Sequence, residues 1–100
     1  MSILAIHCRD LFDRGRLEAM ATAAGLEARS WPVETDPGWC LVNLSEPDAF
    51  DAAREAREAG WRVLAFAPHV RADLFARARE EGFEACARSG LDKVFAARTC

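Results

Sequence analysis

The sequence lacks an excess of positive charge and lacks any long apolar run. Its 100 residues carry 13 Lys and Arg against 16 Asp and Glu, for a formal net charge of −3 at pH 7. Nucleic-acid binders need a basic face that contacts phosphates, so we expect no nucleic-acid partner. A membrane-spanning helix needs roughly 20 apolar residues, and a secretory leader needs a basic and then an apolar segment. Neither pattern is visible, so we expect a cytoplasmic protein with no membrane partner.

Motifs for metals and cofactors are also missing. The four cysteines, Cys8, Cys40, Cys86 and Cys100, form no CxxC-type pair of the kind that binds zinc or performs dithiol chemistry. Cys40 and Cys86 lie in apolar runs, where a free cysteine behaves as a small hydrophobic residue, so no disulfide framework is expected. No glycine-rich dinucleotide fingerprint follows the first apolar run. We therefore predict no metal and no cofactor.

Apolar segments and helical stripes alternate along the chain. The apolar fraction of 51% and the length suit one soluble domain over residues 1–100. Segments typical of strands lie at residues 3–6, 26–31, 40–44, 62–67 and 83–87. Apolar positions at helical spacing lie at Leu17, Met20, Ala21 and Ala24, at Phe50, Ala53 and Ala56, at Leu74, Phe75 and Ala78, and at Leu91, Val94 and Phe95. Gly25, Gly60 and Gly82 mark three helix ends, and Ser45 and Ser89 are predicted N-caps.

This alternation predicts an α/β fold with a parallel sheet between two helical layers. Five strands on this length fit the order 2-1-3-4-5. One connection is unusual, because only residues 32–38, with two prolines and a glycine, join the second and third strands. We expect a loop there in place of a helix.

The chain resembles the receiver domain of bacterial response regulators, which has a flavodoxin-like fold. The resemblance rests on the pattern of Ile3–Cys8, Cys40–Leu44, Val63–Ala67 with the following Pro-His pair, and Glu84–Ser89. It implies a signalling or regulatory domain. A working receiver has an acid pair, a phosphoacceptor Asp, a hydroxyl residue and a Lys at positions that fall here on His7 and Cys8, Asn43, Ala67 and Arg88.

All five of those positions depart from the receiver pattern. Mg²⁺ binds carboxylate oxygens, which His7 and Cys8 do not have. Asn43 has an amide where a phosphoacceptor needs a carboxylate. We therefore expect a degenerate receiver-like domain that is not competent for Asp phosphorylation.

The missing helix should uncover part of one sheet face, and Trp31 and Trp39 flank the gap. In one interpretation both indoles fold over the sheet and replace the helix, because Trp is highly buried on average. In the other, the uncovered face is an association surface, since exposed apolar patches mark interfaces. The second interpretation makes Trp31 and Trp39 interface candidates for a homodimer or a protein partner.

Ligands of open parallel sheets bind at the carboxyl ends of the strands. Polar residues predicted to gather at that edge are His7, Cys8, Asp10, Asn43, Ser45, His69, Arg88 and Ser89. Several helix N-termini meet the same edge and favour an anion. The alternative is structural: the serines cap helices, the arginines pair with nearby acids, and His7 is packed at the end of its strand.

His7-Cys8 with Arg14 also matches HCx5R, the signature of cysteine-dependent phosphatases. A thiolate at a strand end, backbone N–H groups and an Arg would bind and attack a phosphate there. Against this, residues 9–13 contain no glycine for a phosphate-cradling loop, Asp10 and Asp13 would repel phosphate, and Leu11 with Phe12 looks like core packing. We therefore predict a non-catalytic domain that acts through protein–protein association. An anion-binding or phosphatase-like enzyme using Cys8 and Arg14 is the alternative.

Overall fold

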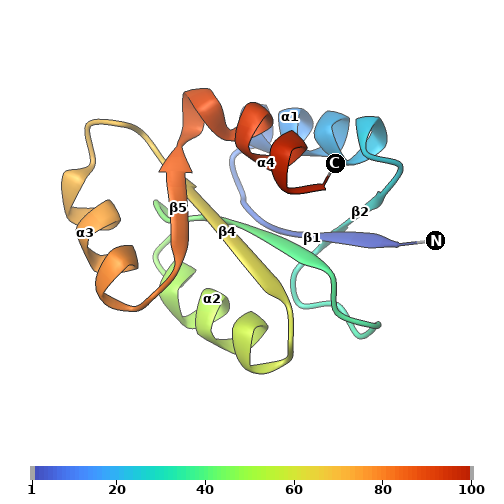
Figure 1. Ribbon diagram of the computed structural model, residues 1–100, viewed down its shortest axis with the longest axis horizontal. Coiled ribbons are helices and arrows are strands. Elements are labelled where there is room, and N and C mark those ends of the chain that lie inside the picture. The colour runs from blue at the N-terminus through green and yellow to red at the C-terminus, as the bar shows by residue number, and fades with distance from the viewer. Residues whose placement is uncertain (1, 100) are drawn as a thin grey trace.

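A computed structural model describes residues 2–99 and contains one five-stranded sheet. Its strands are β1 (Ile3–His7), β2 (Glu27–Ser30), β3 (Trp39–Asn43), β4 (Arg62–Ala67) and β5 (Glu84–Ala87). All neighbouring pairs are parallel, in the order β2-β1-β3-β4-β5 (Figure 1). The predicted α/β class and strand order are confirmed.

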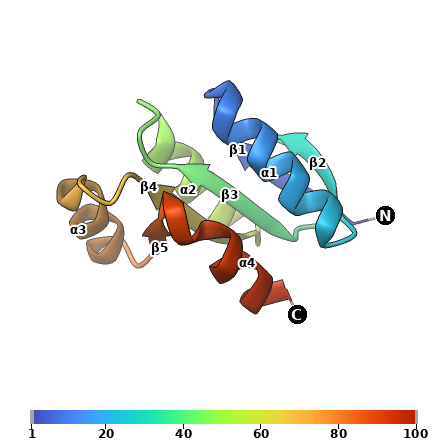
Figure 2. The same cartoon turned by 90° about the horizontal axis from the view of Figure 1, so that it is seen from above.

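Helices cover both faces of the sheet. They are α1 (Leu11–Ala23), α2 (Ala49–Glu58), α3 (Ala72–Glu80) and α4 (Leu91–Thr99), with a short 3₁₀ turn at Arg88–Gly90 before α4. The helices α1 and α4 lie together on one face, and α2 and α3 lie on the other, as Figures 1 and 2 show. None of the helices in residues 2–99 is both long and apolar enough to pass through a bilayer.

Strand alternation divides the core into two halves. Leu4, Ile6 and Leu41 point toward α1 and α4, whereas Ala5 and Val42 point toward α2 and α3. All five side chains are at most 1% exposed. Burial on both faces explains why the central strands read as continuous apolar runs in the sequence.

The helix α2 lies on the sheet through alanine. Ala49, Ala53 and Ala56 are fully buried, and Phe50 is 5% exposed. Small side chains at the contact let the helix axis approach the strands closely. Gly25, just beyond α1, has a φ of 74°, which glycine adopts without a steric penalty, and it ends that helix as predicted.

Two predicted helix starts are wrong. Ser45 is an exposed turn residue whose backbone N–H donates to Oδ1 of Asn43 at 3.0 Å, so its region bends back on the strand end and α2 begins only at Ala49. Ser89 lies inside the 3₁₀ turn, and α4 begins at Leu91. In both places the predicted N-cap residue lies in a tight turn that precedes the helix.

Residues 31–38 contain no helix, as expected, but the two tryptophans do not share one face. Trp31 packs against Trp61 on the face of α2 and α3, with ring centroids 5.8 Å apart. Trp39 packs on the opposite face against Phe95, with centroids 6.1 Å apart. The expectation that both indoles cover the gap is therefore wrong for Trp39. Its position as the first residue of β3 points its side chain toward α4.

Candidate functional site

The sheet brings two loops together at its carboxyl edge. The loop after β1 contains Arg9, and the loop after β3 contains Glu46 and Asp48. The backbone N–H of Arg9 donates to Oε1 of Glu46 at 2.6 Å, and its guanidinium donates to Oε2 of Glu46 at 3.3 Å. The same guanidinium donates to Oδ2 of Asp48 at 3.3 Å. One side chain thus joins the two loops.

His7, the last residue of β1, also belongs to this network through Asp48. It is 9% exposed, and its Nε2 lies 3.0 Å from Oδ1 of Asp48. The hydrogen bond from His7 holds the pKa of the Asp48 carboxyl below its usual value, and the charge of Arg9 acts in the same direction. Asp48 is thereby kept ionised between a histidine and an arginine.

This arrangement places the guanidinium of Arg9, from the loop after β1, between the two carboxylates of the loop after β3. Arg9 forms ion pairs with both Glu46 and Asp48. The chain itself therefore supplies a positive charge to the two carboxylates. Within residues 2–99, no three His, Cys, Asp or Glu side chains are grouped so as to hold a metal ion. The ion pairs fit the structural interpretation, in which the arginines of this edge pair with nearby acids.

Cys8 is a buried thiol with a raised pKa. It is 5% exposed and packs in the core half below α1 and α4. Nδ2 of Asn43 lies 3.6 Å from Sγ of Cys8, which brings two of the predicted site residues together. Desolvation raises the thiol pKa above 9.0, and the amide of Asn43 offsets part of that rise. Nucleophilic cysteines need the opposite shift.

The backbone of residues 8–14 does not form a phosphate cradle. The N–H groups of Phe12 and Asp13 both donate to Oδ1 of Asp10, at 2.9 and 3.1 Å, because Asp10 is the N-cap of α1. The Arg14 guanidinium donates to the carbonyl of Cys8 at 3.4 Å and to Oγ of Ser30 at 2.6 Å. The groups that HCx5R enzymes aim at phosphate are engaged within the chain.

The other predicted site residues lie apart from this network. Arg88 donates to Oδ2 of Asp13 at 3.1 Å, which links the turn after β5 to α1. His69 and Ser89 are exposed in the segments that follow β4 and β5. The edge therefore divides into a Cys8–Asn43 contact, an Arg88–Asp13 ion pair and the network around Arg9.

Two shallow hollows flank His7. One, of about 220 Å³, is lined by residues that include Cys8, Arg14 and Ser30. The other, of about 380 Å³, lies between the segment of Trp31 and the helix α2. In the first hollow, the Arg14 guanidinium donates to the carbonyl of Cys8 and to Oγ of Ser30.

Sequence reasoning missed the most exposed apolar side chains. Leu11 is 83% exposed and Phe12 is 93% exposed, so the expectation that they pack in the core is wrong. They are the first two residues of α1 and lie out of phase with its buried positions Asp13, Leu17 and Ala21. That phase is readable in the sequence, since residues five and six before Leu17 lie on another side of a helix. A third exposed apolar residue, Val70, is 72% exposed in the connection from β4 to α3.

In comparisons with known proteins, no family model matches the chain, and no curated protein shows significant similarity to it.

Proposed function

We propose that this chain is a receiver-like regulatory domain that has no phosphoryl chemistry and acts by binding another protein. One observation carries the proposal. Leu11 and Phe12 present two adjacent, almost fully exposed apolar side chains at the edge of the sheet where α/β proteins bind their ligands. Contiguous exposed apolar surface rimmed by polar residues is typical of protein-binding sites.

The chemistry around this apolar pair supports a binding role. Asn43, at the receiver's phosphoacceptor position, holds the N–H of Ser45 with its side-chain oxygen and faces the thiol of Cys8 with its nitrogen. Arg88, at the position of the receiver's lysine, is paired with Asp13. Each of these side chains has its own partner within the chain, so a second protein would meet a surface that is already organised.

Trp31 and Trp39 contribute less to this proposal than the sequence suggested. Both are half-buried and packed against Trp61 and Phe95. An apolar side chain can anchor a partner only if it is exposed in the unbound protein. Phe12 is more exposed than either tryptophan. The proposal therefore places the partner surface at the start of α1.

The proposal includes a cytoplasmic location and no nucleic-acid partner. Cys8, Cys40 and Cys86 are free thiols, which suits a reducing compartment. The net charge of −3 suits a protein partner better than a polyanion. The phosphatase alternative has no comparable support, because the thiol pKa is raised and Arg14 is bound to Ser30.

Substitution of the apolar pair tests the proposal. The double variant Leu11→Ser, Phe12→Ser and the control Val70→Ser would be compared with the original protein as bait in an extract of the source cells, with quantitative mass spectrometry. Any protein lost with the double variant and kept with the control would be purified and titrated against each bait by calorimetry. We expect binding to weaken by about a hundredfold when two apolar anchors are removed.

Two results would overturn the proposal. One is a set of binding proteins, confirmed by calorimetry, that the double variant retains in full. The other is hydrolysis of a generic phosphate ester by the purified domain that disappears in Cys8→Ser. Either result would require a functional surface elsewhere on the chain or a catalytic thiol.

A further inference from the structure

The two edge strands of the sheet differ in chemistry. On β2, Glu27 and Arg29 carry opposite charges and pair with each other at 2.9 Å. On β5, the consecutive residues Ala85, Cys86 and Ala87 are small, uncharged and only half-buried. Charged side chains discourage pairing of an edge strand with another chain, whereas a small uncharged edge leaves its unpaired backbone groups approachable.

The strand β5 pairs with β4 and with none of the other described strands. It is the last strand of the sheet and lies between α3 and α4 in Figures 1 and 2. A hollow of about 360 Å³ lies beside it, lined by residues that include Phe75, Arg79 and Phe83. An incoming strand would thus find both backbone groups and space for its side chains.

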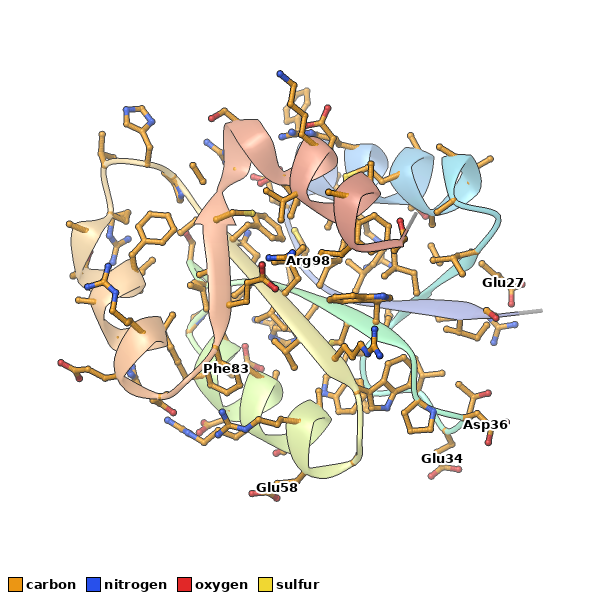
Figure 3. The ribbon with its side chains drawn as sticks, viewed as in Figure 1. Glu27, Glu34, Asp36, Glu58, Phe83 and Arg98 are labelled. Atoms are coloured by element: carbon orange, nitrogen blue, oxygen red, sulfur yellow. The ribbon has the colours of Figure 1, made fainter. Side chains whose placement is uncertain are left out.

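Charges of opposite sign lie symmetrically about the middle of this edge. Glu84 comes two residues before Cys86, and Arg88 comes two residues after it. Both point to the face of α1 and α4, because Glu84 is held by Arg98 of α4 and Arg88 is held by Asp13 of α1. Figure 3 shows Arg98 reaching from α4 toward β5.

This symmetry selects a second copy of the same chain as the occupant. If two β5 strands pair antiparallel with Cys86 opposite Cys86, Glu84 of each copy lies opposite Arg88 of the other, which is the first residue of the 3₁₀ turn after β5. The same register places Ala85 opposite Ala87, so no bulky side chains collide. Opposite charges across an antiparallel pair stabilise it, and the twofold axis supplies the favourable pair twice.

We propose that the chain forms a homodimer by antiparallel pairing of the two β5 edges about Cys86, giving one continuous sheet across two copies. The dimer proposal shares one premise with the proposed function, namely that the domain acts by binding other proteins. The contact of the dimer is the backbone edge of β5, whereas Leu11 and Phe12 belong to α1, which meets the turn after β5 through the Arg88–Asp13 ion pair. The two proposals can therefore fail separately.

Thiol cross-linking tests the register directly. Cys100, which lies outside the described residues, would first be replaced by Ser, and the protein would then be treated with a mild copper oxidant that accepts the two electrons of disulfide formation. We expect a covalent dimer linked through Cys86, identified by mass spectrometry, because facing Cβ atoms in an antiparallel pair are close enough for a disulfide. The additional substitution Cys86→Ser should abolish it.

Equilibrium measurements test the strand edge and its charges. By analytical ultracentrifugation over a concentration series, Ala85→Lys should raise the dimer dissociation constant by about tenfold or more. The matched control Ala28→Lys is the same change on the β2 edge, and it should leave the dimer dissociation constant unchanged. Glu84→Gln and Arg88→Gln should each weaken the dimer, because each removes one of the two charges that face each other across the twofold axis. Circular dichroism would confirm that each variant folds.

Three outcomes would overturn this inference. The first is a monomer at every concentration together with no Cys86 cross-link. The second is a dimer that Ala85→Lys and Ala28→Lys affect equally. The third is a dimer that neither Glu84→Gln nor Arg88→Gln weakens. If instead Leu11→Ser, Phe12→Ser abolishes partner binding while the Cys86 cross-link persists, the two association surfaces are independent.

Discussion

Trp31 and Trp61 meet edge to face, with ring centroids 5.8 Å apart and ring planes at 81°. This contact lies over the part of the sheet where no helix follows β2. Trp31 belongs to the loop after β2 and Trp61 to the connection into β4, so two separate segments cooperate as cover. An aromatic pair supplies the buried area that a helix would otherwise provide.

Replacement of Trp31 by Ala should lower the free energy of unfolding by about 2 kcal/mol, since a half-buried indole and its aromatic contact are lost. Trp31→Phe should lose clearly less, because a ring remains to meet Trp61. Urea unfolding followed by circular dichroism measures both. An unchanged unfolding midpoint in Trp31→Ala would show that the indole does not stabilise the gap.

Asp48 should make folding stability depend on acid pH. The hydrogen bond from His7 lowers its folded pKa below the ordinary 3.8, so the folded state favours the carboxylate. This contribution is fully present above that value and is lost as the pH falls through the folded pKa. In urea titrations at a series of acid pH values, Asp48→Asn should therefore lose less stability than the original protein. A matched control is Asp36→Asn in the exposed loop. Equal pH dependence of the Asp48 and Asp36 variants would contradict the role of the His7–Asp48 bond.

The cysteines should react with iodoacetamide at very different rates. Burial raises the thiol pKa of Cys40 to about 12 and raises that of Cys8 above 9.0, so few thiolates form in the folded protein. Peptide mapping at mildly alkaline pH, at a protein concentration low enough to dissociate the proposed dimer, should find Cys86, which is half-buried, labelled before Cys8, and Cys40 labelled last. In urea, the three rates should converge. Rapid labelling of folded Cys8 at neutral pH would contradict its burial and favour the phosphatase alternative.

The fold was predictable because each strand and helix has a local signature. Continuous apolar runs such as 62–67 mark strands buried on both faces, and Gly25 marks the end of α1. The exposure of Phe12 was also predictable from its phase relative to Leu17. The pattern of the chain therefore determines the layers and their order.

The polar network at the carboxyl edge was not predictable in the same way. Arg9 and Asp48 are 39 residues apart, and only the pairing of β1 with β3 brings their loops together. The failed cap at Ser45 has a related cause, because Asn43 captured its N–H through a side-chain contact. Such side-chain contacts depend on which polar groups the folded chain brings close together. Helical or strand spacing in the sequence does not specify those distances.

One glycine inside α1 and one just beyond its end should respond to alanine with opposite sign. Gly15 lies in the middle of the helix, and a Cβ added there meets no atom within 4 Å. Gly15→Ala should therefore stabilise the protein by about 0.5–1 kcal/mol, through the higher helix propensity of alanine. Gly25 ends the helix with a φ of 74°, a conformation that costs an alanine about 1 kcal/mol.

Urea unfolding of Gly15→Ala, Gly25→Ala and the double variant measures these effects. The double variant should lie near the sum of the single changes, because the two sites are ten residues apart, one inside α1 and the other just beyond its end. Stabilisation by Gly25→Ala would show that residue 25 does not adopt a left-handed conformation. Destabilisation by Gly15→Ala would show that the exposed face of α1 around residue 15 is covered in solution. That result would point to the same surface as Leu11, which lies one helical turn before Gly15.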